Sequence, residues 1–304
     1  MMAIQLENVT KKYNGTTALQ DINLELEAGR IYGLLGRNGA GKTTLLNLLT
    51  TLRFPTSGTI RIFGENPVEN EAILSQVVLI REQGQFPEDF TVNTIVKTAA
   101  AFYPNFDMDY AQRMMETFGL EPKKRFKKLS RGMQSAAGIV VGLAARAEIT
   151  LLDEPSLGLD VVARQQFYDF LLEDYTEHPR TILFSTHLID EVSKLFESVI
   201  FLDKGRITRV EDTEDLRSHA VTLSGRREDI TPWLAGREVL HQEAFGNTMV
   251  ATLYNSLTPE DRRAMERAGI DLSGVPLQKL FIYLSKKALT SAGEPATKEE
   301  VAKL

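Results

Sequence analysis

Apolar and polar residues follow two strand-like patterns along the chain. Residues 3–7 and 21–27 alternate between the two kinds, as half-exposed antiparallel strands do, and Asn14-Gly15 between them is a turn sequence. Continuous apolar runs, which suit strands buried on both faces of a parallel sheet, occur at 31–35, 149–152 and 181–185. Helical patterns accompany these runs, at 43–52, 130–147 and 160–175. This alternation predicts a doubly wound α/β core.

The pattern changes beyond residue 210. Two strand patterns at 198–202 and 206–210, joined by the turn sequence Asp203-Lys204-Gly205, close the first part of the chain. The remainder mixes strand and helix patterns, at 220–223, 248–253, 259–268 and 276–287. We therefore predict two domains, one over 1–210 and a small α+β appendage over 211–304.

Composition and charge narrow the class of protein. Of the 304 residues, 43% are hydrophobic and 25% are charged, as in an ordinary globular protein. No apolar run approaches the roughly 18–20 residues of a membrane-spanning helix, and the start of the chain does not resemble a secretory signal. The absence of cysteine excludes disulfides and thiolate metal sites and fits a reducing cytoplasm. The net charge of −6 argues against nucleic acid as a partner, because phosphate backbones need a basic surface.

A glycine-rich loop follows the first buried run and precedes a helical pattern. Residues 36–43 have the order Gly, four residues, Gly-Lys-Thr, which is the pattern of a phosphate-binding loop. Its glycines let backbone N–H groups surround a phosphate, Lys42 can reach the β- and γ-phosphates, and Thr43 can place a hydroxyl on Mg²⁺. The alternative, a plain glycine turn, is disfavoured by the strand and helix around the loop. The expected phosphate cradle comprises Gly36, Arg37, Asn38, Gly39, Ala40, Gly41, Lys42, Thr43 and Thr44.

The second buried run ends in two carboxylates, Asp153 and Glu154. Ligands of parallel sheets collect at the carboxyl ends of strands, so Asp153 is expected beside the phosphate loop, where it supports Mg²⁺ directly or through water. Adjacent residues of an extended segment point to opposite faces, so the two carboxylates have different roles. Glu154 is the candidate to polarise an attacking water. Without the phosphate loop, the pair would equally suit a solvated strand end.

Further motifs, in a fixed order, resemble those of the nucleotide-binding subunits of ABC transporters. Residues 129–133, Leu-Ser-Arg-Gly-Met, are similar to the LSGGQ signature of that family, and 156–160 are similar to its D-loop. His187 resembles the switch histidine that contacts the γ-phosphate, and Tyr13 resembles the aromatic residue that stacks on adenine. RecA-like and AAA-type ATPases share the phosphate loop and the acidic strand but lack this signature and this histidine.

The resemblance implies a P-loop NTPase core with an antiparallel β-subdomain and an inserted helical subdomain at about 85–147. It also implies that two subunits pair head to tail around two ATP molecules, each held between the phosphate loop of one subunit and the signature of the other. A hydroxyl and N–H groups at a helix start suit such an anion. The residues implied on this second surface are Ser130, Gly132 and Asp160.

The chain departs from the family pattern at two places. Arg131 and Met133 replace a glycine and the glutamine of the signature, a variation that resembles a branch of bacterial transporters, often exporters. The glutamine that couples the nucleotide to the membrane partner falls at Glu82 or Gln83, depending on one gap. We expect it at Gln83, as a catalytic and Mg²⁺-approaching residue.

These observations favour an ATP-hydrolysing subunit that powers a separate membrane-spanning permease, and we expect the direction to be export. The expected assembly is a homodimer or heterodimer of ATP-binding subunits on the cytoplasmic face of the cell membrane, with ATP and Mg²⁺ bound and without nucleic acid. The alternatives are a non-transport ABC-type ATPase acting on a soluble or ribosomal partner, and a nucleotide-sensing regulator without turnover. The single phosphate loop and the intact Glu154 and His187 disfavour both.

Overall fold

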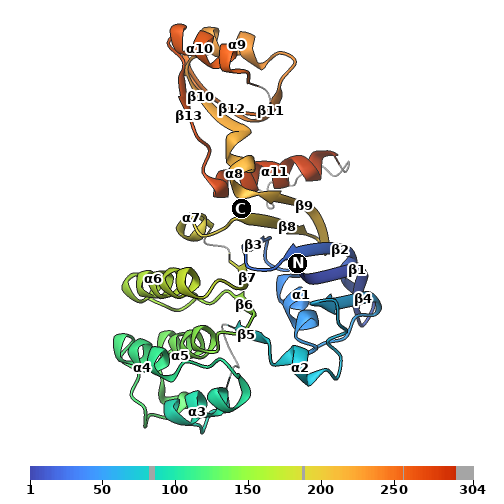
Figure 1. Ribbon diagram of the computed structural model, residues 1–304. Helices are drawn as coiled ribbons and strands as arrows, with labels where there is room; N and C mark the ends of the chain where they lie inside the picture. Colours follow the sequence, from blue (N-terminus) through green and yellow to red (C-terminus); the bar gives the residue numbers. More distant parts are fainter. Residues whose placement is uncertain (82–85, 187–188, 256, 292–304) are drawn as a thin grey trace. The chain divides into compact units, whose positions relative to one another are not determined.

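A computed structural model describes residues 1–81, 86–186, 189–255 and 257–291. The chain divides into two compact units. The first comprises Met1–Leu188 and Leu195–Arg209, and the second comprises Ile189–Lys194 and Val210–Leu304. Figure 1 labels their helices and strands. Within the described ranges, no helix is both long enough and apolar enough to cross a membrane.

The first unit is built on the parallel sheet that the buried runs predict. The strands have the order β5-β6-β7-β3-β8-β9. Their bounds are Ile31–Leu35 (β3), Val77–Arg81 (β5), Ile149–Asp153 (β6), Thr181–Ser185 (β7), Ser198–Asp203 (β8) and Arg206–Asp212 (β9). The pairs from β5 to β8 are parallel, and every residue of β3, β6 and β7 is buried. The predicted core is therefore confirmed, and its central strands are continuously apolar because both of its faces are covered.

A second, antiparallel sheet stands at the N-terminus in the order β2-β1-β4. Its strands are Met2–Tyr13 (β1), Thr16–Glu27 (β2) and Ser57–Ile62 (β4). Helix α1 (Lys42–Leu49) buries four leucines in a core that joins this sheet to the parallel one. The sequence predicts this helix as far as residue 52, but it ends at Leu49, and Thr51 adopts a left-handed φ of 54°. A short helix, α2 (Glu71–Leu74), precedes β5.

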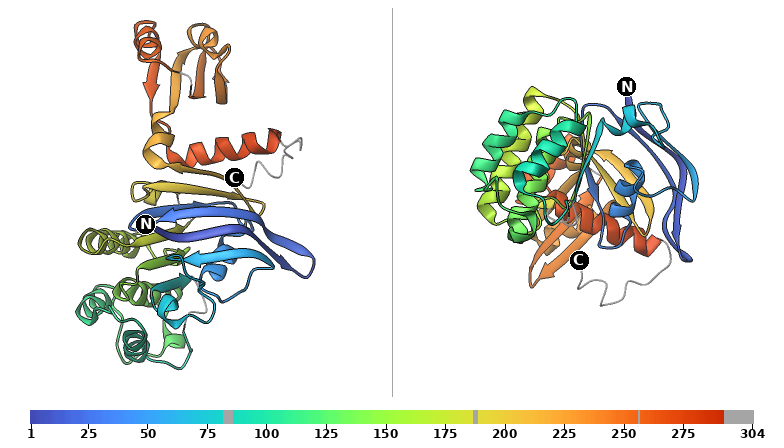
Figure 2. Two further views of the ribbon diagram at one scale, coloured as in Figure 1. Left: turned by 45° about the vertical axis from the view of Figure 1, so that its right-hand side comes forward. Right: turned by 90° about the horizontal axis from the view of Figure 1, so that it is seen from below.

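Helices cover the other side of the parallel sheet, and Figure 2 (right) shows the green helices opposite the blue strands β1 and β2. The elements are α3 (Val92–Phe102), α4 (Met108–Thr117), the 3₁₀ turn η1 (Phe126–Lys128), α5 (Arg131–Ala144) and α6 (Val161–Glu177). Thr91 and Asp107 cap α3 and α4 with their side chains, and Pro104 lies in the break between these helices. Gly142 lets α5 approach β5, because a Cβ there would lie 1.5 Å from Ile80 Cδ1.

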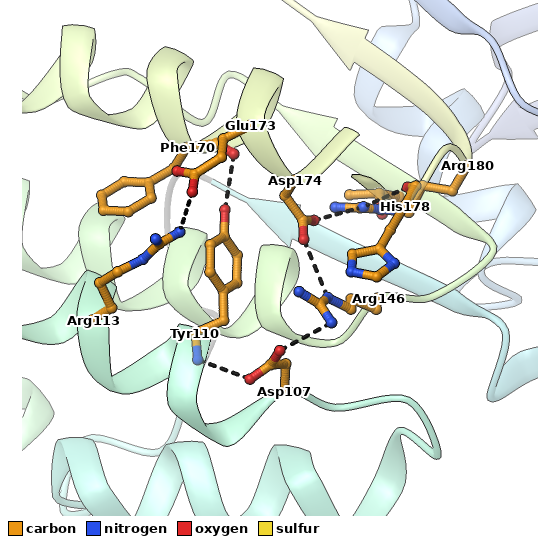
Figure 3. Close-up of polar contacts among 10 residues, drawn as sticks. Asp107, Tyr110, Arg113, Arg146, Phe170, Glu173, Asp174, His178 and Arg180 are labelled. Carbon is orange, nitrogen blue, oxygen red and sulfur yellow. Dashed lines mark hydrogen bonds and ion pairs between the residues drawn. The ribbon is translucent and has the colours of Figure 1, made fainter. Parts of the chain in front are cut away.

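A chain of buried charges ties these helices to the sheet (Figure 3). Asp174 of α6 has no exposed side-chain surface and pairs with Arg180 at 2.7 Å and Arg146 at 3.1 Å. Arg146 also pairs at 2.9 Å with Asp107, whose carboxylate caps α4. Arg180, itself 3% exposed, donates to Thr150 Oγ1 of β6 at 3.1 Å. The network therefore connects the start of α4, the end of α5, α6, the strand β6 and the residue just before β7, and the sequence patterns do not predict it.

The second unit is an α+β fold around a four-stranded sheet in the order β11-β12-β10-β13, with antiparallel pairs. The strands are Ala220–Arg226 (β10), Glu238–Phe245 (β11), Thr248–Tyr254 (β12) and Asp271–Ser273 (β13). Helices α9 (Arg227–Leu234) and α10 (Pro259–Arg267) supply Ile230 and Met265 to its apolar core. The remaining helices are α7 (Ile189–Val192), α8 (Thr213–Ser218) and α11 (Leu277–Ser291).

Candidate functional site

The phosphate loop connects β3 to α1, as the sequence predicts. Gly41 is the N-cap of α1 with φ of 112°, and Gly39 has φ of 81°, values that L side chains rarely adopt. A Cβ at Gly36 would lie 2.5 Å from the carbonyl oxygen of Leu202, and one at Gly41 would lie 2.8 Å from that of Ala18. These glycines are therefore required by the backbone path, which curls the loop over the start of a helix.

Lys42 turns back over this loop. Its Nζ donates to the carbonyl oxygen of Gly36 at 2.7 Å and to that of Arg37 at 3.4 Å. Glu154 Oε1 lies 3.9 Å from the same nitrogen. Burial lowers the pKa of Lys42, and the carboxylates of Glu154 and Asp153 act in the opposite direction. A cation that has given up most of its water is well placed to bind a phosphate, because it has little solvation left to lose.

The two carboxylates stand at the end of β6, where the sequence places them. Asp153 is 8% exposed, and its Oδ1 is buried without a hydrogen-bond partner among the described residues. Glu154 has a left-handed φ of 51°, and its N–H donates to the carbonyl oxygen of Ser185 at 3.0 Å. Such a conformation costs on the order of 1–3 kcal/mol in a non-glycine residue and is concentrated at functional sites.

These residues fit a magnesium ion. Asp153 offers a buried oxygen that lacks a partner, and Thr43 offers a hydroxyl at the exposed start of α1. Among the described residues there is no cluster of three or more His, Cys, Asp or Glu side chains that could hold a metal alone. Mg²⁺ keeps several waters and usually binds through one or two protein oxygens together with substrate phosphates, and Asp153 and Thr43 would provide two such oxygens.

The residues implied on the second surface lie at helix starts. Ser130 caps α5, its Oγ accepting from the Met133 N–H at 3.3 Å, and Asp160 caps α6 by accepting from the Ala163 N–H at 2.8 Å. Gly132 packs against Gly158, because a Cβ on Gly132 would lie 2.7 Å from the carbonyl oxygen of Gly158. In the part of the chain that the structure describes, the contacts of Ser130, Gly132 and Asp160 do not join them to the phosphate loop.

Of the remaining predicted residues, the structure describes Tyr13 but not His187, Gln83 or Glu82. Tyr13 ends β1 with 37% of its surface exposed, and the Lys11 ammonium lies 4.8 Å from its ring centroid, so its adenine contact stays a prediction. His187 and Gln83, together with the alternative Glu82, lie outside the described residues. Sequence reasoning missed Ser185, whose carbonyl holds Glu154. Its position at the end of a buried run next to the acidic strand was the available signal.

A parallel sheet with a phosphate loop at the end of β3 and two acids at the end of β6, one strand away across β7, defines a P-loop nucleoside triphosphatase. Comparison with known proteins agrees. A family model described as "ABC transporter" matches residues 19–157, and one described as "AAA domain, putative AbiEii toxin, Type IV TA system" matches 125–193.

Among curated proteins, the chain is 34% identical to the bacitracin transport ATP-binding protein BcrA of Enterococcus faecalis over 70% of each chain. It is 30% identical to the ABC transporter ATP-binding protein YtrB of Bacillus subtilis (strain 168), over 72% of this chain and 75% of that one. It is 32% identical to the phosphonates import ATP-binding protein PhnC of Thiobacillus denitrificans, over 76% and 95% respectively. The chain therefore belongs to the family of ABC transporter ATP-binding proteins, which are ATPases.

Solved structures show the same fold. An ATP-binding subunit of an ABC transporter superposes with a TM-score of 0.64 at 24% identity, over 71% of this chain and 92% of that one. The cassette MJ0796, in a dimeric post-hydrolysis state bound to ADP and Pi, gives a TM-score of 0.61 at 24% identity, over 69% and 98%. Both likenesses concern the cassette fold.

Proposed function

We propose that the chain hydrolyses ATP to power transport by a separate membrane-spanning permease, working on the cytoplasmic face as one of two paired ATP-binding subunits, identical or different. The observation that carries the proposal is the group at the strand ends, where Lys42 Nζ lies 3.9 Å from Glu154 beside the unpartnered oxygen of Asp153. A buried cation and two acids next to a glycine cradle match the requirements of phosphoryl transfer, which needs positioning and charge neutralisation more than covalent chemistry.

Each residue of this group has a distinct role. Lys42 binds the β- and γ-phosphates, and Glu154 polarises the water that attacks the γ-phosphate. Thr43 and Asp153 would hold Mg²⁺, which neutralises phosphate charge when bound. From the family resemblance, we also assign a γ-phosphate contact to His187 and a link between nucleotide and permease to Gln83.

Pairing of two subunits completes the nucleotide site in this proposal. Helix α5 spans Arg131–Ala144, and its exposed start carries the Ser130 hydroxyl and the Gly132 backbone. The N–H groups of a helix start attract an anion. Because these groups make no described contact with their own phosphate loop, we assign them to the ATP of the second subunit.

An open groove between β5 and the helices α3 and α5 supports the permease as partner. Its volume is about 840 Å³. Apolar residues dominate its lining, among them Leu79, Ile95 and Phe102, and Phe102 is 71% exposed. The acids Glu69 and Glu71 and the basic Arg81 also line it, so its charged residues are two acids and one base. An exposed apolar surface of this kind marks a protein contact, and the acids favour a partner helix that carries basic residues beside its apolar face.

Export is the proposed direction, on the basis of Arg131 and Met133 in the signature. The names of the relatives include both a bacitracin transport and a phosphonates import protein, so transport into inverted vesicles is the measurement that decides.

Replacing Lys42 by alanine should weaken binding of MgATP by about 10–100-fold, because charge-assisted hydrogen bonds contribute about 1.5–3 kcal/mol each. Calorimetric titration of the purified protein measures this. The matched control is Lys123→Ala, an exposed lysine in the connector before η1, which should bind like the wild type. Wild-type affinity for MgATP in Lys42→Ala would show that Lys42 does not bind the phosphates.

Co-purification tests the permease and the groove together. The tagged protein, extracted with its native membrane in mild detergent, should retain a multi-spanning protein that stimulates its ATPase activity after reconstitution. Phe102→Asp should lose at least about 90% of that association, because the charge would be buried against an apolar face, while its basal ATPase rate stays unchanged. Phe245→Asp, at another exposed phenylalanine, should retain the partner. Retention by Phe102→Asp, or the absence of any spanning partner, would contradict the proposal.

A further inference from the structure

The loop that follows Glu154 rests on the first turns of α5. Residues 154–159 fold into two consecutive turns, with the Leu157 N–H donating to the Glu154 carbonyl at 3.1 Å and the Leu159 N–H to that of Ser156 at 3.2 Å. Gly158 has φ of 88° and lies against Gly132. The approach is so close that glycine alone fits at position 132 without a shift of the loop.

One turn further along α5, Ser135 holds the same loop. This serine is 1% exposed, and its hydroxyl lies 2.9 Å from the carbonyl oxygen of Leu157 and 3.3 Å from that of Arg131. A serine within a helix ordinarily donates to the carbonyl four residues earlier, here Arg131. The shorter distance belongs to the loop carbonyl instead, and a single hydroxyl proton serves one acceptor best.

Backbone hydrogen bonds continue this contact as far as Glu154. The Ser135 hydroxyl holds the Leu157 carbonyl, and the Leu157 N–H holds the Glu154 carbonyl. The Glu154 N–H in turn is held by the Ser185 carbonyl at the end of β7. Glu154 keeps its left-handed φ between these two attachments, one to the sheet and one to α5.

We propose that Ser135 is a positioning residue for Glu154: its hydroxyl, through Leu157, fixes the loop that orients the water-polarising carboxylate. This inference rests on the role of Glu154 given under the proposed function. Because α5 begins at the signature residues Ser130 and Gly132, a displacement of the helix start moves Leu157 and, with it, Glu154 of the same subunit. The nucleotide held by the phosphate loop of one subunit thereby adjusts Glu154 of the other subunit, whose signature residues contact that nucleotide.

The test compares Ser135→Ala with Ser135→Thr, which keeps the hydroxyl, in the full-length protein. In Ser135→Ala, kcat for MgATP should fall by about three- to tenfold, the effect of one neutral hydrogen bond, while KM stays within about twofold of the wild type. Hydrogen exchange at the Leu157 amide should be faster, with β6 still protected. Ser135→Thr should recover at least about half of the wild-type kcat. The matched control is Ser218→Ala, which removes an exposed hydroxyl that donates to the Asp215 carbonyl of its own helix at 2.9 Å.

Three results would overturn the proposal. The first is a kcat of Ser135→Ala within about twofold of the wild type while Glu154→Gln is inactive, which would refute the inference and leave the proposed function intact. The second is a Ser135→Thr variant as slow as Ser135→Ala, or a Ser135→Ala variant that does not fold, since either would assign the residue to packing. The third is wild-type turnover in Glu154→Gln, which would overturn the role of Glu154 together with the inference.

Discussion

Glu154→Gln should bind MgATP with wild-type affinity and lose at least about 100-fold in turnover. A positioned general base contributes about 10²–10⁴-fold to a rate, and the amide that replaces the carboxylate keeps its size but cannot take up a proton. Lys42 retains its bonds to the Gly36 and Arg37 carbonyls, so the phosphate cradle is preserved. Phosphate release at saturating ATP measures the rate, and calorimetric titration measures the affinity.

The matched control for this variant is Glu173→Gln. Glu173 lies on α6, where it forms an exposed ion pair with Arg113 at 2.8 Å. Such a pair contributes roughly 0–1 kcal/mol, so turnover should stay within about twofold of the wild type. Turnover in Glu154→Gln equal to that of Glu173→Gln would show that another group activates the water.

Asp174→Asn should lower the free energy of unfolding by about 3–5 kcal/mol. The substitution leaves Arg180, which is 3% exposed, without its anion in the interior, while Arg146 keeps its ion pair with Asp107. Breaking a buried ion pair on one side has this cost because the remaining charge stays buried and uncompensated. The melting temperature should fall by on the order of 10 °C, measured by circular dichroism without nucleotide.

Asp169→Asn is the control for this loss of stability. Asp169 lies on the same helix, is exposed, and accepts from Gln165 at 2.8 Å. The melting temperature of that variant should stay close to the wild-type value, since exposed polar pairs contribute little. An equal effect of the two substitutions would mean that the buried ion pairs drawn in Figure 3 do not stabilise the folded protein.

Burial on both faces explains why much of the fold could be predicted from the sequence. The strands β3, β6 and β7 are fully buried, so each appears as a continuous apolar run. Helix α5 begins where Ser130 can cap it, which is a local signal. In contrast, β11 is only partly buried and mixes His241 with acids and a glutamine. Its sequence therefore shows neither a continuous apolar run nor a regular alternation of apolar and polar residues.

The residues of the candidate site also fall into two groups, those that a local sequence motif predicts and those that only the fold brings together. The phosphate loop and the acidic strand end are contiguous motifs, so their residues could be named from the sequence. The left-handed Glu154, the Ser185 carbonyl that holds it and the Ser135 hydroxyl are contacts between distant segments. No local pattern encodes such contacts. For the same reason Asp174 looks like one more surface acid of a helix until the fold brings Arg180 to it.

Everything proposed for the nucleotide site requires two subunits to pair around ATP, and the mass of Glu154→Gln in solution reports that pairing because this variant should bind ATP without hydrolysing it. Light scattering during gel filtration with MgATP, in the presence of the second ATP-binding subunit where the two differ, should give the mass of two ATP-binding subunits, and removal of the nucleotide should return the single-chain mass. A Glu154→Gln protein that binds MgATP by calorimetry, yet remains at the single-chain mass even with its membrane partner present, would contradict the account.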